Sequence, residues 1–431
     1  MRKIIITLAL IFFYPANAVA VTLYEALNET YRNNTELNAE RENIKISKDD
    51  LRISKGDYLP SASITGSKSK EETNNLTNQS GGDASITDAD PLTTSIKIEQ
   101  TLIDFGRDAE YKKKEIGINL AEAKLLKKEQ DILYKAVEAY SGLILANEKL
   151  TINQRNLSLF ERQVETDKVR LERGQITVSD LAQSESSLAG AQAQFIQAKN
   201  EIVTNKLNYE NIIGKISNLK ILKKTSKSII SIPQSLSGAI NLSKQNNPDI
   251  AIAKLELEQS EKDIEISESD LKPTATLSFE RSYSDDLNAT YDEKEKDVLK
   301  ATVSWPFYSG GKKRVTISKN QSLKTSKRLL LDNAIKTNDT IVATAWANLQ
   351  SSKSFLDSVR LQVRAAQIAN EGITAEYERG SGRTTLDVIQ SNTLLLDAKV
   401  SLSSSERNYL LAQYNLLKSI GLLNSNYIKL K

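Results

Sequence analysis

The side chains that most often carry out chemistry in proteins are missing from this sequence. It contains no histidine and no cysteine, which removes the usual general base, the commonest metal ligand and every Ser-His or Cys-His nucleophile arrangement. Aspartate and glutamate remain, but they are spread along lysine-rich, helix-like stretches, a spacing that is typical of a solvated helix face. We therefore expect no catalytic residue, no metal site and no cofactor, and we expect that the protein is not an enzyme.

The N-terminal 20 residues predict an export signal. Arg2 and Lys3 precede an apolar run over residues 4–13, and small residues at 16–20 suit a cleavage site. Cleavage removes two positive charges, so the formal net charge falls from +3 to +1. A nearly neutral chain has no single-signed field that would attract nucleic acid, so no nucleic-acid partner is expected.

Self-comparison shows that the chain contains two copies of one long segment. Similar openings at residues 33–37 and 246–250 are followed by Pro60 and Pro273, all at a constant offset of 213. Later matches have offsets between 205 and 207, because the piece before them is eight residues shorter in the second copy. Two repeats of this length predict a pseudo-symmetric protomer rather than a solenoid of many small units.

The predicted domain organisation follows this duplication. It comprises a signal peptide at 1–20, a first repeat at 21–218, a linker at 219–236, a second repeat at 237–423 and a C-terminal tail at 424–431. Each repeat is expected to run helix, strand, loop, strand, very long helix, turn and returning helix. The last four elements are expected at about 61–71, 93–104, 107–173 and 179–214 in the first repeat, and at about 274–285, 297–308, 312–379 and 386–421 in the second.

The two longest predicted helices contain no proline and little glycine, and Lys, Glu, Ala, Leu and Gln dominate them. Each would be on the order of 100 Å long as one continuous helix. The returning helices add a heptad pattern, with large residues at one position and small residues three places later, as in Leu181, Leu188 and Phe195 followed by Ser184, Ala191 and Ala198. This period predicts left-handed coiled packing, which suits an α-helical wall and an ordinary long coiled coil about equally.

The predicted strands alternate apolar and polar residues, most clearly at Ala275, Leu277 and Phe279 and at Leu299, Ala301 and Val303. Strands of about ten residues match a tilted transmembrane strand, and past the signal no segment approaches the roughly 20 apolar residues of a spanning helix. A soluble hairpin is the alternative. Four strands cannot close a barrel, and lipid does not tolerate open edges. The sheet would therefore be shared, with two protomers giving eight strands and three giving twelve.

Nearly the whole chain after the signal resembles the TolC family of outer-membrane efflux and type I secretion channels. The resemblance is carried by the paired openings at 33–37 and 246–250, the strand beginnings at Pro60 and Pro273, and, farther on, the segments 305–311 and 377–390. It implies a mainly α fold with a small transmembrane β part, in which a homotrimer forms a twelve-stranded β-barrel continuous with a long α-helical coiled-coil barrel. The linker at 219–236 and the tail would form an equatorial belt.

The resemblance also implies a function, namely an exit duct of a tripartite efflux pump or a type I secretion system in the outer membrane of a Gram-negative bacterium. The duct would extend into the periplasm and conduct substrates passively. Its partners would be a periplasmic adaptor (a membrane fusion protein), an inner-membrane pump or ABC transporter, and outer-membrane lipid. The alternative is a periplasmic coiled-coil adaptor or structural scaffold, which would carry a lipoyl-like all-β insertion between long helices.

Members of the TolC family close the periplasmic end with polar links at helix-turn-helix tips. Carried over residue by residue, the resemblance implies a gate formed by Ser179, Asp180, Tyr377, Arg383, Asp387 and Gln390. One extra residue lies between Gly380 and Arg383, and Gln390 stands in place of a second aspartate, which would leave a single acidic ring. The residues alone favour a different interpretation, in which Asp180 and Asp387 cap their helices and Arg383 is a solvated charge.

Overall fold

The computed structural model describes residues 21–72, 77, 80–81, 89–216, 222–225, 228, 231–286, 292–380 and 382–430. The expected signal peptide lies outside the described residues, as do parts of the expected linker at 219–236. The chain divides into two compact units. Unit 1 comprises Met1–Asn38, Lys128–Asn246 and Asp339–Lys431, and unit 2 comprises Ala39–Lys127 and Asn247–Asn338.

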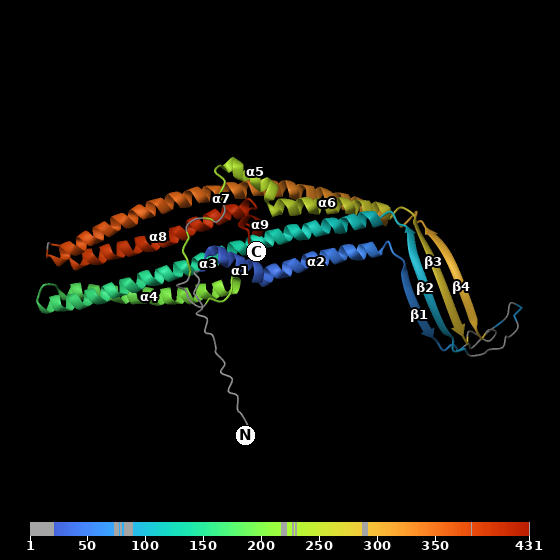
Figure 1. Ribbon diagram of the computed structural model, residues 1–431, viewed down its shortest axis with the longest axis horizontal. Helices are drawn as coiled ribbons and strands as arrows, with labels where there is room; N and C mark the ends of the chain where they lie inside the picture. The colour runs from blue at the N-terminus through green and yellow to red at the C-terminus, as the bar shows by residue number, and fades with distance from the viewer. Residues whose placement is uncertain are drawn as a thin grey trace, which may run out of the picture. The chain divides into compact units, whose positions relative to one another are not determined.

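The duplication is visible in the order and the lengths of the elements (Figure 1). The first repeat contains α1 (Leu23–Asn33), α2 (Thr35–Gly56), β1 (Ser61–Lys68), β2 (Leu92–Ile103), α3 (Arg107–Glu172) and α4 (Val178–Ile212). The second contains α5 (Leu236–Asn246), α6 (Pro248–Ser269), β3 (Thr274–Asp285), β4 (Lys294–Ser304), α7 (Lys312–Glu378) and α8 (Thr385–Ser419), followed by α9 (Ser425–Ile428). Equivalent helices have 11 and 11, 22 and 22, 66 and 67, and 35 and 35 residues.

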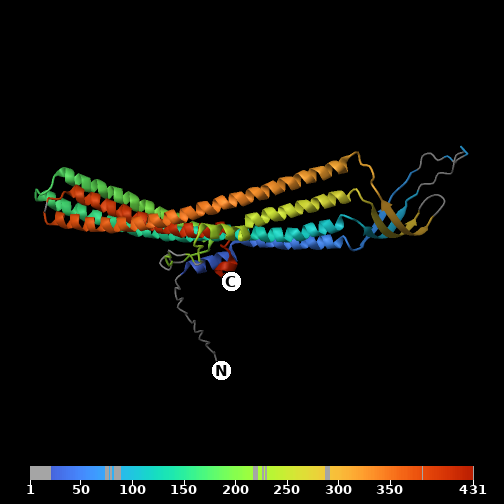
Figure 2. The ribbon, with the colours of Figure 1, turned by 90° about the horizontal axis from the view of Figure 1, so that it is seen from above.

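The four strands of unit 2 form one antiparallel sheet in the order β1-β2-β3-β4, as labelled in Figure 1, and Figure 2 shows the same sheet from above. The register aligns Ala62, Ile98, Phe279 and Leu299 across the sheet. Because side chains alternate between faces, one face carries these residues with Ile64, Ile96, Leu277, Ala301 and Val303, and the opposite face carries Lys97, Glu99, Glu280 and Lys300. The apolar face is open, since Ile64, Leu299 and Val303 are each more than 70% exposed.

Prolines set the ends of two strands that differ from their expected bounds. β1 ends at Lys68 rather than near 71, because Ser69 N–H donates to the carbonyl of Pro91 and proline has no N–H to return the bond. Pairing resumes one step farther on, between Glu71 and Ala89. β4 ends at Ser304 rather than near 308, since Pro306 cannot donate to a ladder.

Ion pairs fasten the helices of unit 2. Lys113 and Lys127 of α3 contact Asp263 and Asp249 of α6, and Lys324 and Lys327 of α7 contact Glu261 and Glu256 of α6. Helix α6 is therefore held between the parts of α3 and α7 that belong to this unit. Within the described residues, no helix combines the length and the low charge that crossing a membrane would require.

The core of unit 1 is built from both repeats. Its largest fully buried side chains include Tyr140 of α3 and Tyr414 of α8, and α1, α5 and α9 also contribute to it. Tyr140 places its hydroxyl 2.9 Å from the carbonyl oxygen of Val21 and 2.7 Å from that of Lys223. Burial raises the pKa of this phenol, so that it stays a donor. The N-terminal segment and the described part of the linker are thereby fixed to α3.

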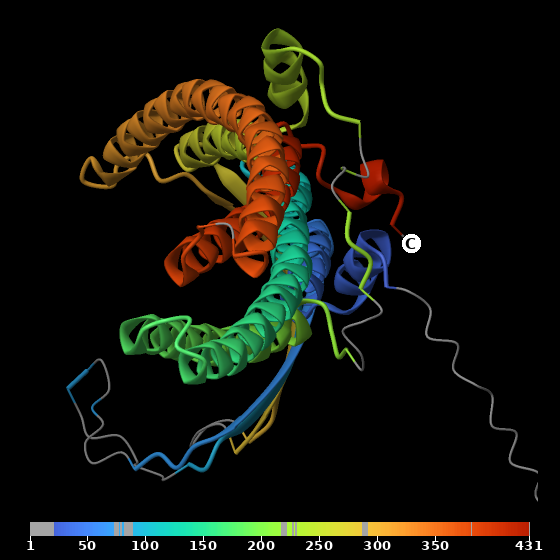
Figure 3. The ribbon, with the colours of Figure 1, turned by 90° about the vertical axis from the view of Figure 1, so that its left-hand side faces the viewer.

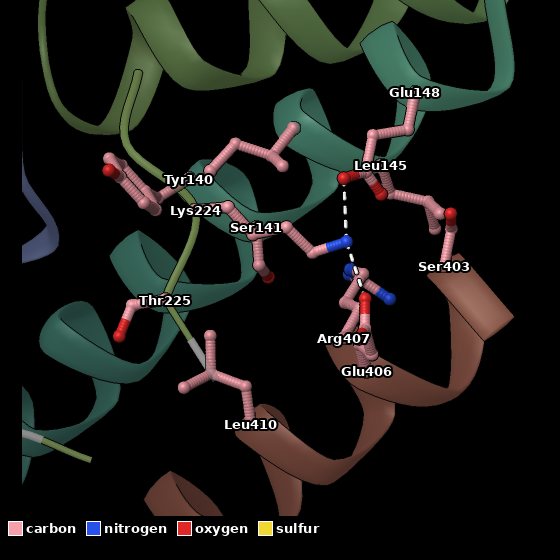
Figure 4. A pocket seen from close by; sticks show the side chains of 11 residues that line it. Tyr140, Ser141, Leu145, Glu148, Lys224, Thr225, Ser403, Glu406, Arg407 and Leu410 are labelled. Carbon is pink, nitrogen blue, oxygen red and sulfur yellow. Dashed lines mark hydrogen bonds and ion pairs between the residues drawn. The ribbon is translucent and has the colours of Figure 1, made fainter. Parts of the chain in front are cut away.

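Lys224 extends this attachment to the second repeat (Figure 4). Its ammonium group lies 2.6 Å from Glu148 of α3 and 2.5 Å from Glu406 of α8. Burial works against the charge, but hydrogen bonds to both carboxylates outweigh it and raise the pKa of Lys224. The linker therefore joins the two repeats through a doubly paired cation.

Small residues let the long helices of unit 1 approach each other closely (Figure 3). Ser184, Ala191 and Ala198 of α4 are buried, and so are their heptad equivalents in α8, Ser391, Ala398, Ser405, Ala412 and Ser419. A Cβ atom at Gly142 of α3 would lie 2.9 Å from Oδ1 of Asn205 on α4. Close packing at the small heptad positions is what the sequence pattern predicts.

Candidate functional site

The described ends of the two helical hairpins have the same local construction. Gly174 and Gly380 end α3 and α7 with positive φ angles of 68° and 71°, as glycine permits. Each returning helix then begins with a capping box. Thr177 Oγ1 accepts the N–H of Asp180 at 3.2 Å while Asp180 accepts the N–H of Thr177 at 2.8 Å, and Thr384 and Asp387 repeat this at 3.2 and 2.9 Å.

These caps account for the two aspartates expected at the gate. Hydrogen bonds from the backbone N–H and the hydroxyl of Thr177 hold the pKa of Asp180 below its ordinary value of 3.8. The equivalent bonds from Thr384 lower the pKa of Asp387 in the same way. The hydroxyl that starts α4 is that of Thr177, whereas Ser179 lies exposed in its first turn. Within one chain, both carboxylates therefore act on their own helices.

Arg383 is paired within its own hairpin. Its Nε donates to Glu376 Oε2 at 2.6 Å, and both side chains are about half exposed. This hydrogen bond raises the pKa of the guanidinium group. Gln390 is exposed in α8, one turn after Asp387.

Tyr377 belongs to a buried polar network that joins all four helices of the hairpins. Its hydroxyl donates to Oδ1 of Asp167 at 3.1 Å and lies 3.0 Å from Thr385 Oγ1. Because the phenol has one proton, Thr385 is the donor in the second bond. Ser184 donates to Oδ2 of Asp167 at 2.5 Å. The guanidinium carbon of Arg170 lies 4.2 Å from the centre of the Tyr377 ring.

Asp167 is the centre of this network, and the sequence reasoning missed it. The residue is completely buried, and Gln163 contributes hydrogen bonds of 3.0 Å to both of its oxygens. A buried carboxylate is tolerated only when its hydrogen bonds are supplied. A signal was available in the sequence, because Asp167 continues the stripe of Phe160 and Val164 at helical spacing, where an apolar residue is expected.

The network is specific to one arrangement of the two repeats. At the offset of 206, Ile373 is equivalent to Asp167, and Leu171 is equivalent to Tyr377. The acid therefore exists only in the first repeat and the phenol only in the second. Neither hairpin could form this contact with a second copy of itself.

A cleft of about 520 Å³ lies between the hairpin ends in unit 1. Its lining includes three of the expected gate residues, Asp180, Tyr377 and Arg383, together with Arg170, Gln175 and Arg379. Ser179, Asp387 and Gln390 are not part of the lining. Three arginines beside a capped aspartate offer charge-assisted hydrogen bonds to a neighbouring polar surface. Over the described ranges of the chain, no group of three or more acidic side chains could hold a metal ion.

Comparison with known proteins places the chain in a family. The family model for outer membrane efflux proteins matches residues 26–215 and 239–422. The outer membrane efflux protein BepC of Brucella suis is 27% identical over 417 residues, covering 96% of this chain and 88% of BepC. The outer membrane protein TolC of Escherichia coli is 21% identical over 359 residues, covering 79% and 72% of the two chains.

A solved structure shows the same fold. The Campylobacter jejuni CmeC outer membrane channel superposes with a TM-score of 0.79 at 14% identity, covering 93% of this chain and 85% of that one. The expected resemblance to the TolC family and the mainly α fold class are thereby confirmed. The family model covers both repeats and well over half of the length of this chain. The chain therefore belongs to the outer membrane efflux protein family.

Proposed function

We propose that three copies of the chain assemble into one passive duct whose periplasmic end is gated by the Asp167–Tyr377 network. The chain is an outer-membrane protein that serves as an exit duct for efflux or type I secretion. The observation that carries the trimer is the four-stranded sheet, which has one apolar face and, in the described residues, pairs β1 and β4 on one side only.

In a lipid environment, the unpaired edges of β1 and β4 must pair with other strands. An unpaired strand in the membrane core leaves backbone groups without partners, at a cost of several kcal/mol each. Pairing β4 of one copy with β1 of the next satisfies them. Two copies would give eight strands, whose interior side chains fill, whereas three copies give twelve strands and room for an aqueous lumen. The apolar face would then contact lipid, and the face with Lys97, Glu99, Glu280 and Lys300 would line an aqueous lumen.

Exposed apolar residues on the helices support the same assembly. Ile196, Val203 and Leu207 of α4 and Phe355, Leu361 and Ile368 of α7 are each 57% to 69% exposed. Rows of large apolar side chains on a helix face are unfavourable in water and mark an interaction surface. In the proposed trimer, neighbouring copies cover them.

The gate would work by fastening the two hairpins of each copy together. Asp167, Ser184, Tyr377 and Thr385 hold the tips inward, and Arg383 and Asp180 line the cleft where a neighbouring tip would dock. We propose Ser179, Asp387 and Gln390 as part of the same constriction. A periplasmic adaptor that separates the hairpins would open the pore, and an inner-membrane pump or ABC transporter would supply the energy.

The duct itself would need no catalytic step and no cofactor. The family relatives bear names of channels and efflux proteins rather than of enzymes. The adaptor alternative calls for an all-β insertion between long helices, whereas α3 and α4 are joined by only five residues, 173–177. The cargo, whether a small molecule or a protein, would be set by the pump.

Electron microscopy tests the assembly. Detergent-purified protein should show a threefold particle with a narrow helical extension. The mass of the particle, after the bound detergent is subtracted, should equal the mass of three chains from which the signal peptide has been removed. A monomer that stays in solution without detergent would contradict the duct.

Removal of the Tyr377 hydroxyl should favour the open tip. Tyr377→Phe leaves the buried Asp167 one donor short, which costs about 2 kcal/mol in the closed state and raises the open-to-closed ratio about thirtyfold. Single-channel recordings in planar bilayers should show larger or longer openings, and Asp167→Asn should act in the same direction. Tyr427→Phe, at an exposed position of α9, is the control. Equal conductance of all three variants and wild type would contradict the gate.

Arg383→Ala should also raise single-channel conductance, because it removes the guanidinium group from the cleft between the hairpin ends. Arg360→Ala, which removes an exposed guanidinium from the middle of α7, should leave the conductance unchanged. An unaltered current through well-folded Arg383→Ala trimers would remove Arg383 from the gate.

Acid should loosen the tips through their caps. A lowered pKa means that the ionised side chains of Asp180 and Asp387 stabilise the first turns of α4 and α8 fully above pH 3.8. This effect is lost as the pH falls below 3.8 through the lowered values. Because loosened helix starts would weaken the packing of the tips, the current should rise as the pH falls below 3.8. The double variant Asp180→Asn/Asp387→Asn should shift or abolish this rise, since asparagine caps a helix without titrating. An identical acid response in both proteins would show that other groups cause it.

A further inference from the structure

The connection from β4 to α7, residues 305–314, exposes an unusual group of aromatic side chains. Trp305, Phe307 and Tyr308 are 64%, 85% and 79% exposed. They follow directly on Val303 of the apolar sheet face. Exposed Trp and Tyr at the end of a transmembrane strand are typical of the membrane–water interface.

Three consecutive cations follow the aromatic residues. Lys312, Lys313 and Arg314 form the first turn of α7, which contains no acidic residue. Cations are unfavourable at a helix N-terminus, because the helix dipole is positive there. These three cations therefore oppose the stability of the helix that they begin. Such a conflict at the surface of the protein indicates an anionic partner outside the chain.

The equivalent connection in the first repeat lacks this charge. There Arg107 begins α3 and is followed by Asp108 and Glu110, the acidic residues of the first turn. Arg107 also lies over the ring of Tyr58, with its guanidinium carbon 4.9 Å from the ring centre. Of the described first turns of α3 and α7, only that of α7 therefore has three consecutive cations and no acidic residue.

Contacts within unit 2 hold the β4–α7 connection in place. Trp305 donates its indole N–H to the carbonyl of Leu271 at 3.1 Å, and Lys313 donates to the carbonyl of Asp270. Gly310 and Gly311 take positive φ angles of 63° and 76°, which form the turn into α7. Lys312 and Arg314 remain exposed. The hydrogen bonds and the glycine turn thus fix the backbone that carries the aromatic residues and these two cations.

We propose that the β4–α7 connection binds the anionic headgroups of phospholipids in the leaflet that faces the periplasm. This inference rests on the proposed function, which places the sheet in the membrane and the helices in the periplasm. In this arrangement the aromatic side chains would lie at the level where the acyl chains end, and the exposed Lys312 and Arg314 would lie beyond them at the level of the phosphates. A cation near an anionic membrane surface strengthens binding about fivefold.

Native mass spectrometry tests this with purified trimers in a non-ionic detergent. Wild type titrated with phosphatidylglycerol should retain more lipid than with phosphatidylcholine. The triple variant Lys312→Gln/Lys313→Gln/Arg314→Gln should lose this preference, with affinity for phosphatidylglycerol falling at least about tenfold. The control Lys45→Gln/Lys48→Gln/Arg52→Gln removes the same charge from exposed positions on α2 and should keep the preference.

The outcomes separate this inference from the proposed function. Equal retention of the two lipids by wild type, or equal loss of phosphatidylglycerol in both triple variants, would overturn the lipid site while leaving the duct intact. Failure of wild type to enter phosphatidylcholine vesicles as a conducting trimer would instead overturn the duct. Competition by millimolar inorganic phosphate at constant ionic strength would show that the connection binds free anions rather than lipid.

Discussion

Every backbone N–H and C=O group inside a membrane must find a partner within the protein, and this constraint governs the rest of the molecule. The described residues of one chain supply four strands, so in the proposed duct the hydrogen bonds of β1 and β4 would be completed by other copies. The helices of the proposed trimer would then have the same threefold symmetry as the sheet. Two repeats with helices of matching length allow three chains to present six similar hairpins to one central axis.

Regular features of the structure were readable from the sequence because they repeat. The heptads of small residues at Ser184 and Ala191 correspond to buried positions in α4, and the proline-free stretches correspond to α3 and α7. Strand ends were less readable, because the end of β1 depends on Pro91, the residue just before the partner strand β2. Propensity along one segment carries no information about the donor it will face.

The gate shows the same limit. Asp180 and Asp387 follow threonines by three residues, so their capping role is local and was open to sequence reasoning. The partner of Tyr377 lies 210 residues away, and no local pattern links the two. The resemblance to a family supplied the positions of the expected gate residues, but it did not supply Asp167, whose contact is visible only once four helices are placed together.

The division of acid and phenol between the repeats bears on how many ways the pore can open. In a ring of six near-identical hairpins, all six contacts between adjacent hairpins would be equivalent, and the ring could open at any of them. With Ile373 and Leu171 at the mirrored positions, the Asp167–Tyr377 contact ties each hairpin to one neighbour only. The seams of the proposed trimer would therefore alternate between fastened and unfastened. In the proposed trimer, the three seams between subunits would therefore separate first and give the pore a triangular outline. Full opening to a round outline would follow only when the Asp167–Tyr377 contact inside each subunit breaks as well.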